Sequence, residues 1–115
     1  MKANAFRSSA MAGLSEEQFQ AQVVQVAKSL GWMVYHTFDS RRSASGFPDL
    51  VLVHPVQGVL FRELKTVRGV VSAAQRRWLV SLVAAGADAG VWRPSDWDDV
   101  VLPCLRGVGQ VVDDE

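Results

Sequence analysis

Two carboxylates and an ammonium group stand near one another in the middle of this sequence. Glu63 and Lys65 are two residues apart within a run rich in strand formers, and Asp49 immediately precedes a short apolar run over residues 50–54. Side chains of a β-strand alternate between its faces, so Glu63 and Lys65 are expected on the same face. If the two runs pair as a hairpin, Asp49 lies at the same end, and the three side chains converge.

Such a convergence could bind a hard divalent cation. Mg²⁺ prefers oxygen ligands and usually takes one or two carboxylates together with water and phosphate oxygens. A bound cation stabilises charge on a phosphate and acidifies a water molecule, and Lys65 could orient that water. On spacing alone, an ordinary salt bridge on a solvated face is the simpler interpretation of Asp49, Glu63 and Lys65.

Helix and strand patterns surround these residues. Ser15-x-x-Gln18 and Ser72-x-x-Gln75 are capping boxes that open two helices, expected over residues 16–30 and from Ser72 to Gly86. Strands are expected over residues 32–37, 50–54, 59–65 and 87–92, and a short helix over residues 96–102, which Pro103 stops. The order helix, three strands, helix, strand, short helix predicts an α/β fold with a mixed central sheet flanked by helices.

Length and composition indicate one ordinary globular domain. The chain has 115 residues, 49% of them hydrophobic, and its single cysteine, Cys104, excludes an internal disulfide and fits a reducing cytoplasm. No apolar run is long enough to span a membrane, and the N-terminus lacks the apolar stretch of a signal peptide. We expect a flexible leader at 1–14, the domain at 15–103 and an acidic tail at 104–115.

The net charge of zero conceals a gradient along the chain. Residues 41–87 hold seven basic residues and only two acidic ones, whereas residues 88–115 hold seven acidic and two basic ones. A basic stretch of this kind is typical of a phosphate-facing surface. A solvated surface paired with the acidic end explains the charge equally well.

Four motifs, taken together, resemble one known family. Gly46-Phe47-Pro48-Asp49-Leu50, Glu63-Leu64-Lys65, Ser72-Ala73-Ala74-Gln75 and an early helical Glu16 look like the VRR-NUC branch of the PD-(D/E)xK nucleases. They occur in the family's order, on the elements where the family carries them, over about residues 15–100. Chain length resembles the stand-alone members of phages and bacteria.

The resemblance implies a restriction-endonuclease-like core of order αβββαβ and a site that uses Mg²⁺ or Mn²⁺. Asp49 and Glu63 would be metal-binding carboxylates, with the Leu64 carbonyl as a third ligand. Lys65 would position or activate the attacking water. Glu16 would be the helix-one acid, with Glu17 as the competing candidate, although any acid in a first helical turn is favoured by the helix dipole.

Gln75 resembles a catalytic-site glutamine of the family and should point toward the sheet. Its other interpretation is a helix cap, and one glutamine is not expected to do both. The resemblance further implies contact with DNA phosphates by a loop and by basic side chains. The residues concerned are Ser40, Arg41, Arg42, Ser43, Arg68, Arg76 and Arg77.

The function implied is metal-dependent hydrolysis of DNA phosphodiester bonds, selective for branched, flapped or junction DNA as in repair and recombination. A homodimer is expected, with neither an organic cofactor nor a membrane partner. There are two rival hypotheses. In the first, the protein is a non-catalytic DNA-binding module in which residues 72–92 form half a helix-turn-helix. In the second, it is an inactive protein with a nuclease fold. The strand pattern over residues 87–92 argues against the first rival.

Overall fold

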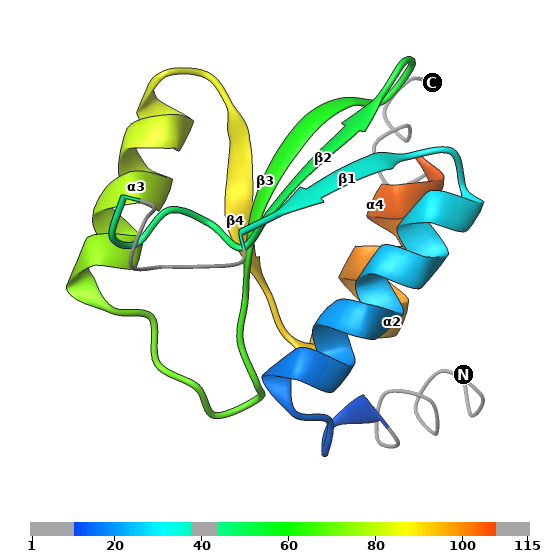
Figure 1. Cartoon of the computed structure of the whole chain (residues 1–115), viewed down its shortest axis with the longest axis horizontal. Coiled ribbons are helices and arrows are strands. Elements are labelled where there is room, and N and C mark those ends of the chain that lie inside the picture. Colours follow the sequence, from blue (N-terminus) through cyan, green and yellow to red (C-terminus); the bar gives the residue numbers. More distant parts are fainter. Residues whose placement is uncertain (1–10, 38–43, 108–115) are drawn as a thin grey trace.

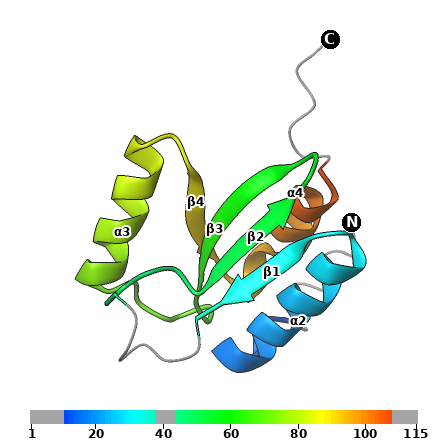
Figure 2. The same ribbon diagram turned by 45° about the horizontal axis from the view of Figure 1, so that its top comes forward.

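A four-stranded mixed sheet forms the centre of the protein in this computed structural model, which describes residues 11–37 and 44–107 (Figure 1). Strands β1 to β4 lie side by side in chain order, the first three antiparallel and the fourth parallel to β3. Their bounds are Met33–His36, Leu50–His54, Gly58–Leu64 and Asp88–Trp92. Helix α2 (Glu16–Ser29) lies on one side of the sheet and α3 (Ala73–Ala84) on the other, as Figure 2 also shows. The predicted α/β architecture is confirmed.

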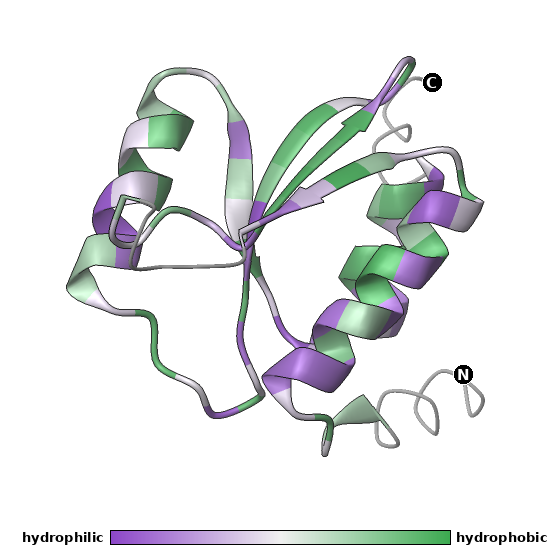
Figure 3. Cartoon of the chain, in the orientation of Figure 1, coloured by the Kyte–Doolittle hydropathy of each residue, from purple (hydrophilic) through white to green (hydrophobic). Residues whose placement is uncertain are grey.

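Helix α2 forms where its capping box and apolar spacing predict it. The Ser15 hydroxyl accepts from the Gln18 N–H, and the Gln18 side chain accepts from the Ser15 N–H. Phe19, Val23 and Ala27 recur at helical spacing and are fully buried. Figure 3 shows the hydrophobic and hydrophilic positions of α2 distributed around its axis. The cap therefore fixes the first turn, and burial holds the helix on the sheet.

The main core lies between α2 and one face of the sheet. Leu50 and Leu52 of β2 and Leu60 and Leu64 of β3 are buried at alternate positions, on the side of the sheet that packs against the helix. Each such leucine contributes roughly 1.5–3 kcal/mol by burial. Further apolar side chains complete this core: Trp32, Trp92, Trp97, Val101, Leu102 and Leu105.

The helical segment after β4 runs further than its sequence predicts. A 3₁₀ turn (Pro94–Asp96) and a π-helical turn (Trp97–Val101) lead into α4 (Leu102–Arg106). The prediction that Pro103 stops the helix is wrong. Pro103 lies in the first turn of α4, where a missing N–H costs no helical hydrogen bond, and the Leu102 N–H bonds back to the Trp97 carbonyl.

Both ends of the described chain contact the core. Leu105 is buried and its carbonyl accepts from the Trp32 indole at 2.9 Å, beyond the domain end expected at residue 103. Met11 and Leu14, within the expected leader, pack against the same core. Over the described ranges, no helix combines the length and the apolar character that crossing a membrane requires.

The second face of the sheet is only partly covered. We define the open sheet face as the adjacent side chains of Met33, Tyr35, Val53 and Val59, which are 74%, 63%, 40% and 45% exposed. The strand register sets Met33, Val53 and Val59 in one row across three strands. Helix α3 covers another part of this face, and none of its residues is fully buried.

Candidate active site

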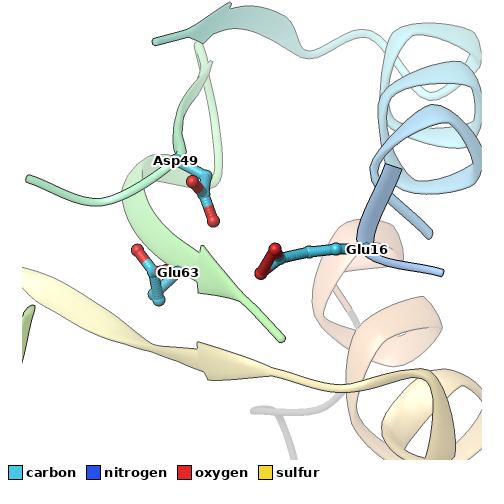
Figure 4. Close-up of side chains that lie close together, drawn as sticks. All are labelled: Glu16, Asp49 and Glu63. Atoms are coloured by element: carbon cyan, nitrogen blue, oxygen red, sulfur yellow. The ribbon is translucent and has the colours of Figure 1, made fainter. Parts of the chain in front are cut away.

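Three carboxylates from three different elements meet at one end of the sheet (Figure 4). Glu16 is the first residue of α2, Asp49 immediately precedes β2, and Glu63 lies near the end of β3. One oxygen from each lies within 4.8 Å of one oxygen from both others. Of the two acids proposed for the first helix, Glu16 is the one in this cluster, which we call the carboxylate triad.

The register of the β2–β3 hairpin brings Asp49 and Glu63 together. Leu50 pairs with Arg62, so Asp49, one residue earlier, stands beside Glu63, one residue later. The Leu64 N–H then donates to Asp49 Oδ2 at 2.8 Å, which fixes the orientation of that carboxylate. The capping box at Ser15 adds Glu16 by fixing where α2 begins.

Glu63 has an unusual environment for a carboxylate. The residue is 2% exposed, and Oε2 accepts from Gln75 Nε2 at 2.7 Å and lies 3.7 Å from Lys65 Nζ. Burial, followed by the nearby charge of Asp49, raises the pKa of Glu63 to about 8, although Lys65 acts in the opposite direction. Oε1 is buried without a hydrogen-bond partner among the residues described.

These features fit a divalent metal ion. Three carboxylates in this space repel one another, and a buried oxygen without a partner is costly. A hard cation would remove both penalties, since Mg²⁺ and Mn²⁺ favour carboxylate and carbonyl oxygens. The donor set of Glu16, Asp49 and Glu63 is therefore suitable for either ion.

The Gln75 side chain both caps α3 and hydrogen-bonds to Glu63, contrary to expectation. Its side-chain oxygen accepts from the Ser72 N–H at 2.8 Å, closing the capping box of α3. Its amide nitrogen donates to Glu63 at 2.7 Å. The prediction that one glutamine would not serve both roles is wrong because an amide offers an acceptor and two donors on separate atoms.

The turn before β2 docks α3 so that Gln75 reaches the triad. Gly46 has a φ of +87°, and a Cβ at this position would lie 2.5 Å from the Ala74 backbone. The Trp78 indole donates to the Ser45 carbonyl at 3.1 Å, and the rings of Phe47 and Trp78 meet edge to face. Sequence motifs mark Gly46, but its contact with α3 emerges only from the fold.

The expected DNA-contacting residues are only partly within the described chain. Ser40, Arg41, Arg42 and Ser43 lie outside it. Arg76 and Arg77 are exposed on α3, and Arg68 is exposed beside a cavity of about 600 Å³ that residues 12–15 also line. Arg62 is different, because it is buried against Trp92 and bonded to Asp88 at 2.8 Å.

Comparisons with known proteins agree with the fold. The family model of the VRR-NUC domain matches residues 7–96. A solved structure described as a VRR-NUC domain is 26% identical, with a TM-score of 0.58, covering 66% of this chain and 81% of its own. A second, a VRR-NUC domain protein, is 21% identical, with a TM-score of 0.60 and coverage of 73% and 81%. None of the curated proteins matches the sequence significantly.

The sheet, the helices and the family match together define a nuclease-type domain. The chain belongs to the VRR-NUC domain family. Of the motifs that first suggested this family, those of Asp49 and Glu63 lie at one end of the mixed sheet, and that of Gln75 opens α3.

Proposed function

We propose that this protein is a metal-dependent deoxyribonuclease that hydrolyses phosphodiester bonds. The observation that carries the proposal is Glu63 Oε1, a buried and unpartnered oxygen within the carboxylate triad. A structural ion pair with Lys65 would need only one carboxylate, and it would leave Asp49 and Glu16 unexplained. Membership of a nuclease-type family supports the same function.

Each residue has a definite task in this proposal. Asp49, Glu63 and Glu16 would hold Mg²⁺ or Mn²⁺, with the Leu64 carbonyl as a further ligand. The ion supplies a Lewis acid that stabilises charge on the phosphate and lowers the pKa of water. The Lys65 ammonium, 3.7 Å from Glu63, orients the attacking water and favours its deprotonation.

Two hydrogen bonds fix the orientation of the carboxylates, one from the Gln75 side chain to Glu63 and one from the Leu64 N–H to Asp49. Gln75 holds Glu63 Oε2, which leaves Oε1 to face the ion. The Leu64 N–H restrains Asp49 in the same way. Groups that orient metal ligands are commonly as necessary to a site as the ligands themselves.

DNA would approach along the exposed cations near the triad. Arg68 lines a cavity together with residues 12–15, which directly precede α2 and Glu16, and Arg76 and Arg77 are exposed on α3, the helix that carries Gln75. Ser40 to Ser43 would contribute phosphate contacts from the preceding loop. The domain offers little surface for reading bases, which favours selection of DNA by structure, such as flaps, branches or junctions.

We further propose that the protein acts as a homodimer. The open sheet face exposes four large apolar side chains in adjacent positions. Contiguous apolar surface of this kind commonly marks a protein–protein interface. A second copy would cover it and present two sites to a branched substrate.

The proposal is tested by cleavage of labelled single-stranded, duplex, flapped and four-way-junction DNA in Mg²⁺, Mn²⁺ or EDTA. The native protein should cut at least the branched substrates with either ion, and EDTA should abolish cutting. Asp49→Ala and Lys65→Ala should each lose at least about 100-fold in rate. Arg106→Met, in the last turn of α4, serves as the matched control and should retain activity.

A negative result would also be informative. If no DNA is cut and DNA binding is unchanged by EDTA, Asp49→Ala and Lys65→Ala, the catalytic proposal fails. The protein would then be a DNA-binding module or an inactive member of its family.

A further inference from the structure

Arg93 lies outside the carboxylate triad and outside every motif of the sequence, yet it makes a specific set of contacts close to Lys65. Its guanidinium Nη1 donates to the carbonyl oxygens of Thr66 and Gly69, each at 2.7 Å, and lies 3.4 Å from that of Val67. The side chain thus bonds to the loop that immediately follows Lys65. Convergent carbonyl dipoles repel one another unless a cation or donor lies between them.

The backbone of Arg93 is itself held firmly. Arg93 directly follows Trp92, whose ring is buried and whose carbonyl accepts from the Lys65 N–H at 3.1 Å. The Arg93 N–H donates to Asp96 Oδ2 at 2.9 Å. The guanidinium therefore extends from a rigid point at the end of β4 and can fix the loop relative to the sheet.

The loop held by Arg93 packs directly on Lys65. A Cβ built on Gly69 would lie 3.3 Å from Lys65 Cδ and 3.1 Å from Thr66 Oγ1, so Gly69 rests against the aliphatic part of the lysine. The Gly69 N–H closes the turn by donating to the Thr66 carbonyl at 3.1 Å. Moving this turn would remove a packing contact from the Lys65 side chain.

We propose that Arg93 is a positioning residue for Lys65, acting through the turn of residues 66–69. This inference rests on the proposed function, since it assigns Lys65 a catalytic task that depends on its position. Displacing a catalytic group by about 1 Å costs as much as 100-fold in rate. Arg93 bonds to the backbone of a turn that also carries Arg68, whose exposed side chain is one of several cations expected to meet DNA. We therefore expect the loss of Arg93 to affect turnover, through Lys65, more than binding.

The first test is independent of activity. In NMR spectra of the metal-free protein, an NOE should join the Gly69 Hα and Lys65 Hδ protons, and Arg93→Met should remove it. The Gly69 amide should also exchange faster in Arg93→Met, while amides of α2 and β3 keep their native protection. An unchanged NOE in Arg93→Met, or equal loss of protection throughout the protein, would overturn the proposal.

The second test separates turnover from binding in the nuclease assay. Arg93→Met should lower kcat roughly 10- to 100-fold with KM for DNA changed less than about threefold. Arg93→Lys, which can still donate to the carbonyl oxygens, should recover much of this loss, and Arg106→Met should match the native protein. A raised KM with an unchanged kcat would contradict the positioning role. So would an equal decrease in kcat in Arg93→Lys and Arg93→Met.

The two tests distinguish the possible failures. If the native protein cuts no DNA, the proposed function fails, and the NOE still decides whether Arg93 holds the turn against Lys65. If the protein cuts DNA and Arg93→Met cuts it at the native kcat, the proposed function stands and the inference about Arg93 is wrong.

Discussion

Glu63 is the residue on which the electrostatics of the site depend most. Its carboxylate is almost fully buried, and the triad surrounds it with two further negative charges. In the metal-free protein the folded state therefore favours the protonated acid, with a pKa of about 8. The ordinary pKa of a glutamate applies once the chain unfolds.

This difference in pKa makes stability depend on pH in a definite direction. Between about pH 4.5 and 8 the folded metal-free protein holds a proton that the unfolded chain releases, so the free energy of unfolding should fall as pH rises. Glu63 can lower the free energy of unfolding by at most about 1.4 kcal/mol for each pH unit. Urea unfolding in EDTA at pH 5, 6, 7 and 8 measures it.

The control is Glu63→Gln, which keeps the shape of the side chain and cannot titrate. In Glu63→Gln the free energy of unfolding should lack the pH dependence that Glu63 causes. The two histidines are common to both proteins, so their effect cancels when the two pH profiles are compared. Identical pH dependence in the two proteins would show that Glu63 is ionised over this range and that its burial costs less than we infer.

At the scale of elements, the placement of α3 controls the site. Helix α3 carries Gln75 to Glu63, and it is docked through Ala74 and Trp78 onto the turn around Gly46. None of the residues of α3 is fully buried, so this docking is held by few contacts. The turn before β2 is therefore as necessary to the site as the residues of the triad.

Gly46→Ala tests that docking. The new methyl group would meet the Ala74 backbone, and the positive φ adds strain, so we expect a loss of stability above about 3 kcal/mol or a displaced α3. Gly58→Ala is the matched control, because Gly58 has a φ of +98° and open space around it. It should cost only about 1–2 kcal/mol from the backbone conformation.

Thermal and urea unfolding of the two variants give the comparison. The crystal structure or amide spectrum of Gly46→Ala should place its largest changes in the turn and α3. Equal destabilisation by Gly46→Ala and Gly58→Ala would mean that the close approach to Ala74 does not restrict the helix.

Much at this scale was predictable from the sequence. The capping boxes at Ser15 and Ser72 determine where both long helices begin, and two neighbouring strand-forming runs predict the hairpin of β2 and β3. These are local signals, in which neighbouring residues satisfy one another's hydrogen bonds or share one face. For the same reason the spacing of Glu63 and Lys65 correctly indicated a common face.

Tertiary contacts explain what the sequence left undetermined. The two roles of Gln75 depend on the distance between α3 and β3, and the contacts of Arg93 depend on the loop after β3 folding back toward the end of β4. The helix continues through Pro103, against the prediction, because the π-helical turn before it changes which N–H groups need a carbonyl partner. Arg62 is one of the seven basic residues of the stretch 41–87, but it is buried beside Asp88 and Trp92.

At the scale of the whole molecule, the two faces of the sheet differ. One face is covered by α2 and the helical segment after β4, whereas the open sheet face remains in contact with solvent. The triad lies at the end of the sheet, next to the N-terminus of α2 (Figure 4). Along β2 and β3, Asp49 and Glu63 alternate in step with Val53 and Val59, so two residues of the triad lie on the same side of the sheet as the open sheet face.

A charge on that face should prevent dimer formation. We expect Tyr35→Glu to elute and scatter light as a monomer, while the native protein forms a dimer whose interface buries about 800 Å² on each copy. Val56→Glu is the control, since Val56 is 81% exposed in the hairpin turn outside the open sheet face. A native protein that stays monomeric at high micromolar concentration would contradict the homodimer.

We propose that Glu16, Asp49 and Glu63 together hold a divalent cation. Titration of Mn²⁺ into the metal-free protein, followed by electron paramagnetic resonance of the free ion, tests it most directly. We expect saturable binding by the native protein and by Arg106→Met, and affinity at least about tenfold lower in Asp49→Asn and Glu63→Gln. Absence of binding, or equal affinity in all four proteins, would contradict the metal site.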